Sequence, residues 1–379
     1  MTERLSALLH READQLHVPA PPAAQTLAAA HRARRRRTTT RLAATAGTVA
    51  LVGAVAVGAA VLGDGGHRAP HRNGAVADPP ATHPADVGAV FAVGDTVYLR
   101  GGSVSATMQE TVQAMYLTSA GVLVRTNKDG ASDGGAPFHF SLVAPDGATT
   151  DLGLTLGEVV PATDPSEPYL AYASMRDETV QAVVVDVTTG DEVARVDVPG
   201  SFSWGGWEAP PVALAGSTVY IGNDDAVDMV DWRTGVTSQS EVIPGSTIPD
   251  VSGGHVVVAG GGSTVSVLDA ATGEDLLQVP AGRLTYVTLS PDGRYAKVVD
   301  QAEEAGFDIY SIADGTHVGV DGEAWNHGWT SDGDQFGVSA TGVEVCSVAT
   351  GDCTTNPLPD GLRVDDNTFV RVLGQTYES

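Results

Sequence analysis

The chain has 379 residues and a formal net charge of −26 at pH 7, so it would repel nucleic-acid phosphates. Hydrophobic residues make up 42% of it, which excludes wholesale disorder, and 45 glycines with 21 prolines favour short strands over long helices. Two cysteines exclude both a disulfide-dense scaffold and a four-thiolate zinc site.

The first segment, residues 1–41, is basic and predicted to be helical. Thr2 can cap a helix in which Leu5, Leu8, Leu9 and Leu16 share one stripe. Residues 2–17 would then be either a docking helix for a cytoplasmic partner or a segment that lies on the membrane surface. In the second case, anionic lipid would hold the arginines that follow.

Residues 42–63 are 22 residues without a charge, which predicts a transmembrane helix. At ~1.5 Å per residue the run would be about 33 Å long, enough for a bilayer core of about 30 Å. Charge differs sharply on its two sides. Residues 1–63 hold eight arginines and three acidic residues, a net +5, whereas residues 64–379 hold 13 basic and 44 acidic residues, a net −31.

Orientation follows from the basic cluster that precedes the span, which is Arg34, Arg35, Arg36, Arg37 and Arg41. Arginine-rich flanks stay in the cytoplasm, so we expect a cytoplasmic N-terminus, contact with membrane lipid, and an exported acidic domain. The alternative is a cleaved signal peptide. Such peptides have a shorter apolar region behind a short basic one, whereas 41 residues precede this run, so a signal anchor is the better prediction.

Residues 64–87 are rich in glycine, proline and histidine and lack apolar periodicity, so a flexible stalk is predicted. His67, His71 and His83 are interpreted as solvated; a metal site is the alternative.

From residue 88 onward a repeat of about forty residues is visible. Short β-type runs end in Asp-Gly or Thr-Gly turns, at Gly147, Gly190, Gly235, Gly273, Gly315 and Gly351. An apolar residue stands five positions before each glycine, and a polar residue stands two positions after the first five. This is the pattern of a half-buried hairpin whose turn needs a positive φ.

A second glycine opens an earlier run in most repeats, at Gly121, Gly216, Gly254, Gly293 and Gly333. Each repeat therefore predicts four short strands with no helix between them. Such a unit is the blade of a β-propeller.

Several of these turns resemble those of a known superfamily. LSPDGRYAKVV (residues 289–299) and its echo WTSDGDQFGVS (residues 329–339) are similar to the S-P-D-G turn of TolB-type and WD-repeat-like propellers. VVDVTTGD and VLDAATGE resemble the D-x-x-T-G hairpins of the same proteins. The resemblance covers residues 88–375 and implies the fold. Family members bind proteins, peptides or ligands, and some are enzymes, so it does not select a function.

The blade count follows from length. Residues 88–375 are 288 positions, which at about 41 per repeat gives seven four-stranded blades; six or eight remain alternatives. Six hairpins are visible, so both chain ends must build the seventh. We expect residues 87–100 to pair with a C-terminal strand at residues 368–373 and close the ring.

Cys346 and Cys353 flank one of the hairpin turns and would face each other on adjacent strands. In an exported domain they are predicted to form a disulfide. The alternative is a buried Cys346 and a free Cys353.

The sequence contains no H-E-x-x-H motif, nucleophile elbow, Walker loop or complete calcium loop. No catalytic, cofactor-binding or metal-ligating residue is therefore assigned. His327, between Trp325 and Trp329, is expected to pack within strands. Trp204 and Trp207 lie among glycines and could form a ligand-contacting surface; packing over a blade edge is the alternative.

These patterns predict a non-enzymatic, single-pass membrane protein with four parts: a cytoplasmic segment (1–41), a span (42–63), a stalk (64–87) and an extracytoplasmic propeller (88–379). The propeller would be a binding or sensing module for an unknown protein, peptide or small ligand, with a regulatory role if residues 2–17 bind a partner. One alternative is a propeller hydrolase or lyase with carboxylates and histidine at one end of its axis. A structural envelope protein is the other.

Overall fold

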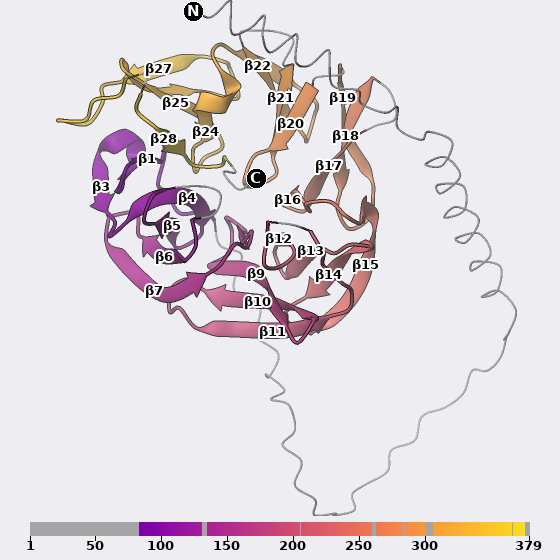
Figure 1. Ribbon diagram of the computed structural model, residues 1–379. Helices are drawn as coiled ribbons and strands as arrows, with labels where there is room; N and C mark the ends of the chain where they lie inside the picture. Colours follow the sequence, from indigo (N-terminus) through magenta and orange to yellow (C-terminus); the bar gives the residue numbers. More distant parts are fainter. Residues whose placement is uncertain are drawn as a thin grey trace, which may run out of the picture. The chain divides into compact units, whose positions relative to one another are not determined.

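The computed structural model describes residues 83–130, 135–204, 206–259, 263–282, 285–300, 306–365 and 367–375. In this part of the chain, 28 strands form seven four-stranded antiparallel sheets that follow one another around an axis (Figure 1). The predicted seven-bladed β-propeller is confirmed.

The predicted span, the arginine cluster and the N-terminal helix lie outside the described residues, as does the stalk up to residue 82. No helix among the described residues is long and apolar enough to cross a bilayer. Their helices are two 3₁₀ turns, η1 (Arg100–Gly102) and η2 (Ala324–Asn326).

Blades two to seven each use four consecutive strands, with the first strand innermost and the fourth at the rim (Figure 1). Blade two consists of β4 (Thr111–Thr118), β5 (Gly121–Asn127), β6 (Phe138–Val143) and β7 (Thr149–Leu156). Blade three consists of β8 (Ala162–Thr163), β9 (Tyr169–Arg176), β10 (Thr179–Asp186) and β11 (Glu192–Val198). Blade four consists of β12 (Val212–Ala215), β13 (Thr218–Gly222), β14 (Ala226–Asp231) and β15 (Val236–Pro244). Blade five consists of β16 (Val251–Ser252), β17 (His255–Ala259), β18 (Thr264–Asp269) and β19 (Asp275–Pro280). Blade six consists of β20 (Thr285–Leu289), β21 (Tyr295–Asp300), β22 (Phe307–Ser311) and β23 (His317–Val320). Blade seven consists of β24 (His327–Trp329), β25 (Gln335–Ser339), β26 (Gly342–Cys346) and β27 (Cys353–Asn356).

Blade one joins the two ends of the propeller. Its order is β28 (Val370–Val372), β1 (Phe91–Val93), β2 (Thr96–Leu99) and β3 (Val104–Thr107), and Phe91 pairs with Val372. The predicted closure by residues 87–100 and 368–373 is confirmed. Pairing with β28 therefore covers the edge of β1 that would otherwise be open to another chain.

The turn glycines have the conformation that the repeat predicts. All six hairpin glycines have φ between 71° and 87°. In the turn that ends at Gly273, Asp269 Oδ1 accepts hydrogen bonds from the Thr272 amide, 2.7 Å away, and from the Thr272 hydroxyl. These bonds lower the pKa of Asp269. The D-x-x-T-G sequence therefore closes its own turn.

The core lies between neighbouring blades, where their apolar faces meet. Between blades three and four, Ala182 and Val184 from β10 belong to one cluster with Val219 and Ile221 from β13. All seven residues of β5 are buried, because both faces of an interior strand contact protein. Ala85 and Val87, at the end of the predicted stalk segment, are also buried in the core.

The predicted disulfide joins Cys346 and Cys353 across β26 and β27, with their Cα atoms 4.0 Å apart. Cys346 is buried and Cys353 is exposed. The bond therefore links an interior strand of blade seven to its rim strand.

Candidate functional site

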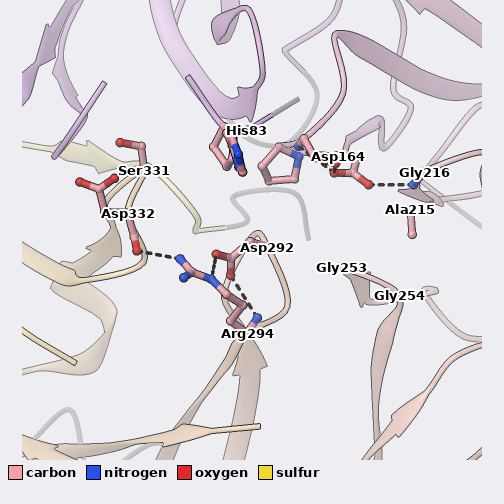
Figure 2. Close-up of a pocket in the computed structure, with 13 residues that line it drawn as sticks. His83, Asp164, Ala215, Gly216, Gly253, Gly254, Asp292, Arg294, Ser331 and Asp332 are labelled. Carbon is pink, nitrogen blue, oxygen red and sulfur yellow. Dashed lines mark hydrogen bonds and ion pairs between the residues drawn. The ribbon is translucent and has the colours of Figure 1, made fainter. Parts of the chain in front are cut away.

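A cavity of about 820 Å³ lies on the propeller axis, where turns from five blades converge (Figure 2). These turns join the first and second strands of blades three to seven. They contribute Asp164, Gly216, Gly254, Asp292, Arg294 and Asp332, among others, and His83 lies beside them. We call this cavity the axial mouth. Its volume is within the usual range for ligand pockets, although its lining is unusually polar.

Asp164 connects two of the blades at this mouth. Its Oδ1 accepts hydrogen bonds from the amide and hydroxyl of Ser166, at 2.8 and 2.7 Å. Its Oδ2 accepts a 2.7 Å hydrogen bond from the amide of Gly216 in the next blade. Both oxygens of this buried carboxylate therefore hold the turns in place.

Arg294 makes a second connection, between blades six and seven (Figure 2). Its Nε donates to Asp292 Oδ2, and its Nη2 donates to the carbonyl oxygen of Asp332 at 2.7 Å. Partial burial opposes the charge of Arg294, but the hydrogen bond and charge of Asp292 outweigh it and raise the pKa of the guanidinium. The cation and Asp292 thus neutralise each other.

The first residues of blade one are fixed at the same place. Ser331 Oγ accepts hydrogen bonds from the amides of Val87 and Gly88, at 3.2 and 2.9 Å. The amide of Ser331 donates to the Gly88 carbonyl oxygen at 3.1 Å. The chain therefore enters the propeller beside the axial mouth.

The fixed charges of the axial mouth do not balance. Its lining holds three carboxylates, from Asp164, Asp292 and Asp332, and one guanidinium. Asp332 is exposed, whereas the oxygens of Asp164 and Asp292 already accept hydrogen bonds. The arrangement suits a ligand with a positively charged group.

Metal binding has no support from the described residues. The one group of potential ligands with suitable spacing there is Glu344, Cys346 and Cys353. Both cysteine sulfurs are bonded to each other, so they are not available as thiolates.

The two tryptophans singled out in the sequence lie elsewhere, on the connection between β11 and β12. Trp204 and Trp207 are half-buried, with ring centroids 5.9 Å apart, and Phe202 lies 5.6 Å from Trp204. Asp224 accepts hydrogen bonds from Ser201 and Ser203 of this connection. The pair is thus positioned and partly accessible, and its role as a ligand surface stays a prediction.

His327 is buried in β24, as its expected packing role requires. Its Nδ1 lies 2.9 Å from the Glu323 carbonyl oxygen, and its ring contacts Phe307 edge-on. Burial lowers the pKa of the imidazole.

Sequence reasoning missed Lys297, which lies next to His327. Lys297 Nζ is buried and donates to the carbonyl oxygens of Ala324 and His327, at 3.2 and 3.0 Å. Burial lowers its pKa to about 8. The sequence did contain a sign of this buried charge. Lys297 is one of two lysines in the chain, and it interrupts the apolar run YAKVV.

Comparison with known proteins assigns no function to the site. No protein-family model matches the chain, and no curated protein does. Among solved structures it is similar to TolB from Acinetobacter baumannii, with 12% identity and a TM-score of 0.42 over 62% of this chain and 63% of that one. The chain thus spans less than two thirds of that TolB.

Two other similar structures are BamB from Moraxella catarrhalis and the WD40 domain of Neurospora crassa Pan2. They share 15% and 13% identity, with TM-scores of 0.35 and 0.39. The matches cover 70% and 76% of this chain, and 75% and 91% of those chains. The predicted propeller fold is confirmed by the seven four-stranded sheets described above.

Proposed function

We propose that this protein is a membrane-anchored, non-enzymatic binding module whose extracytoplasmic propeller takes a cationic ligand group at the axial mouth. The observation that carries this proposal is the unbalanced charge of the mouth, where Arg294 is already paired and Asp332 is exposed. A guanidinium or ammonium group would form charge-assisted hydrogen bonds with that carboxylate.

Anchoring and location are supported by separate features. Residues 42–63 have the length and composition of a membrane span, and five nearby arginines precede it. The Cys346–Cys353 disulfide is typical of an oxidising compartment outside the cytoplasm. In this proposal residues 1–41 are cytoplasmic, residues 64–87 form the stalk, and residues 2–17 could engage a cytoplasmic regulator or lipid.

The binding test uses the full-length protein in detergent micelles and a fluorescein-labelled triarginine peptide. We expect Asp332→Asn to weaken binding roughly tenfold, because it removes one charge-assisted hydrogen bond. Asp352→Asn, on another turn of the same blade, is the matched control and should bind as the parent does. Equal affinity of the Asp332→Asn variant and the parent would reject the axial mouth as the site.

A second candidate is a propeller hydrolase or lyase, because Asp164, Asp292, Asp332 and His83 do line one end of the axis. Asp164 and Asp292 are already occupied by structural hydrogen bonds, which favours binding over catalysis. Mass spectrometry of bound ligand separates the two: a binding module releases it unchanged. A purely structural role would require no sizeable concave site, so the cavity argues against that alternative.

A further inference from the structure

The opposite face of the propeller carries a second set of accessible groups. Because the turns after the innermost strands of five blades meet at the axial mouth, those strands all run toward it. Their starting ends therefore lie on the other face. So do the connections that lead from the rim strand of one blade to the innermost strand of the next.

Exposed large hydrophobic residues concentrate on these connections or at the start of the strand that follows. Ile248 precedes β16, Tyr286 lies at the start of β20, Trp325 lies in η2 just before β24, and Phe369 precedes β28. They are 49%, 42%, 54% and 64% exposed. Among the described residues, only Val236 is another exposed large hydrophobic, and it lies on a rim strand. We call the first four residues the aromatic face.

Four successive blades, five, six, seven and one, each contribute one residue to the aromatic face. The connection that leads into blade four carries the half-buried Trp204 and Trp207. Folding alone does not require large exposed side chains near the start of the innermost strand in four successive blades, and such clustering is typical of an interaction surface.

Two of these rings form a pair that is held in place. The ring centroids of Tyr286 and Trp325 are 5.3 Å apart, although the residues belong to different blades. Gln375 Nε2 donates to the carbonyl oxygens of Trp325 and His327. The η2 turn that carries Trp325 is therefore fixed before any ligand arrives, which reduces the entropy cost of binding.

The charge around the aromatic face is negative. The five connections that lead into blades four to seven and one are residues 199–211, 245–250, 281–284, 321–326 and 357–369, and they hold seven acidic residues and two arginines. Asp250 immediately precedes β16 and is exposed to solvent. Burial raises the pKa of Tyr286, and the nearby charge of Asp250 adds to this rise.

We infer that the aromatic face docks a segment of a partner protein that combines apolar and basic side chains. Apolar side chains would pack on Tyr286, Trp325 and Phe369. Lysine or arginine side chains would meet Asp250, Asp321 and Glu323, or lie over the rings of Tyr286 and Trp325 as cations do. The Phe369 ring already has the Arg371 guanidinium 4.1 Å from its centroid. This second surface is independent of ligand binding at the axial mouth.

The test measures binding of fluorescein-labelled octapeptides to the full-length protein in detergent micelles. An alternating lysine–leucine peptide should bind about tenfold more tightly than an alternating lysine–glycine peptide, and far more tightly than a glutamate–leucine peptide. Trp325→Ala should abolish the advantage of leucine over glycine. Val236→Ser, which removes an exposed apolar side chain elsewhere, and Asp332→Asn, at the axial mouth, should leave that advantage unchanged.

Other outcomes would overturn the inference. Equal binding of the two lysine peptides, or an unchanged leucine advantage in Trp325→Ala, would show that only net charge attracts the probe. Dimers in sedimentation that Trp325→Ala converts to monomers would identify a second copy of the chain as the occupant. Loss of peptide binding on addition of maltodextrin would identify a carbohydrate surface instead.

Discussion

Lys297 Nζ donates a 3.0 Å hydrogen bond to the carbonyl oxygen of His327, and Gln375 donates to the same oxygen from the C-terminal end of the described chain. A buried ammonium group with carbonyl partners loses hydration without gaining an opposite charge, so its protonated form is disfavoured in the folded protein.

This relationship predicts a pH dependence of stability. The pKa of Lys297 is about 8 in the folded protein against 10.5 for the free side chain, so the unfolded chain binds more protons between these values. The free energy of unfolding should therefore rise with pH, by about 2 kcal/mol between pH 7 and 9.5. Urea unfolding at both pH values measures it. Lys297→Met should lack this gain, and an equal gain in that variant would contradict the assignment.

Two turn glycines offer a matched pair of substitutions. Gly253 and Gly216 have nearly the same φ, 55° and 54°. A Cβ at Gly253 would lie 2.1 Å from the carbonyl oxygen of Asp292 in the next blade, whereas one at Gly216 would meet nothing within 4 Å. Gly216→Ala should cost about 1 kcal/mol of stability from backbone strain alone, and Gly253→Ala at least 2 kcal/mol more. Equal urea midpoints for the two variants would show that the blades do not approach so closely.

The proposed location is testable without the propeller. A phosphatase that is active only outside the cytoplasm, fused after Thr82, should be active in a bacterial host and sediment with the membranes. Replacing Arg34, Arg35, Arg36, Arg37 and Arg41 with glutamine should reduce that activity several-fold, because the charge bias that retains the N-terminus is gone. A soluble, exported phosphatase would instead support the cleaved signal peptide.

The repeat predicted the blades because each turn glycine meets a local need for positive φ. The pairing of Phe91 with Val372 was also predictable, since six visible hairpins left both chain ends to complete a ring. The axial mouth was not. Asp164, Asp292 and Asp332 are ordinary turn residues in the sequence and become neighbours only through ring geometry.

Trp325 and Trp329 show that the sequence does not predict the burial of individual side chains. They are four residues apart, yet Trp329 is fully buried against Tyr295 and Trp325 is 54% exposed. Trp325 lies in the 3₁₀ turn η2, whose hydrogen bonds involve Glu323 and the distant Gln375. Periodicity cannot reveal such a contact.

The composition of blade one has a consequence for biogenesis. The strand partner of Phe91 is Val372, which is synthesised 281 positions later. Because the ribosome synthesises the chain from its N-terminus, the sequences of the other six blades are complete before β28 can pair with β1. Until then the exposed flank of β1 is a site where a chaperone could hold the nascent protein or a neighbouring molecule could insert wrongly.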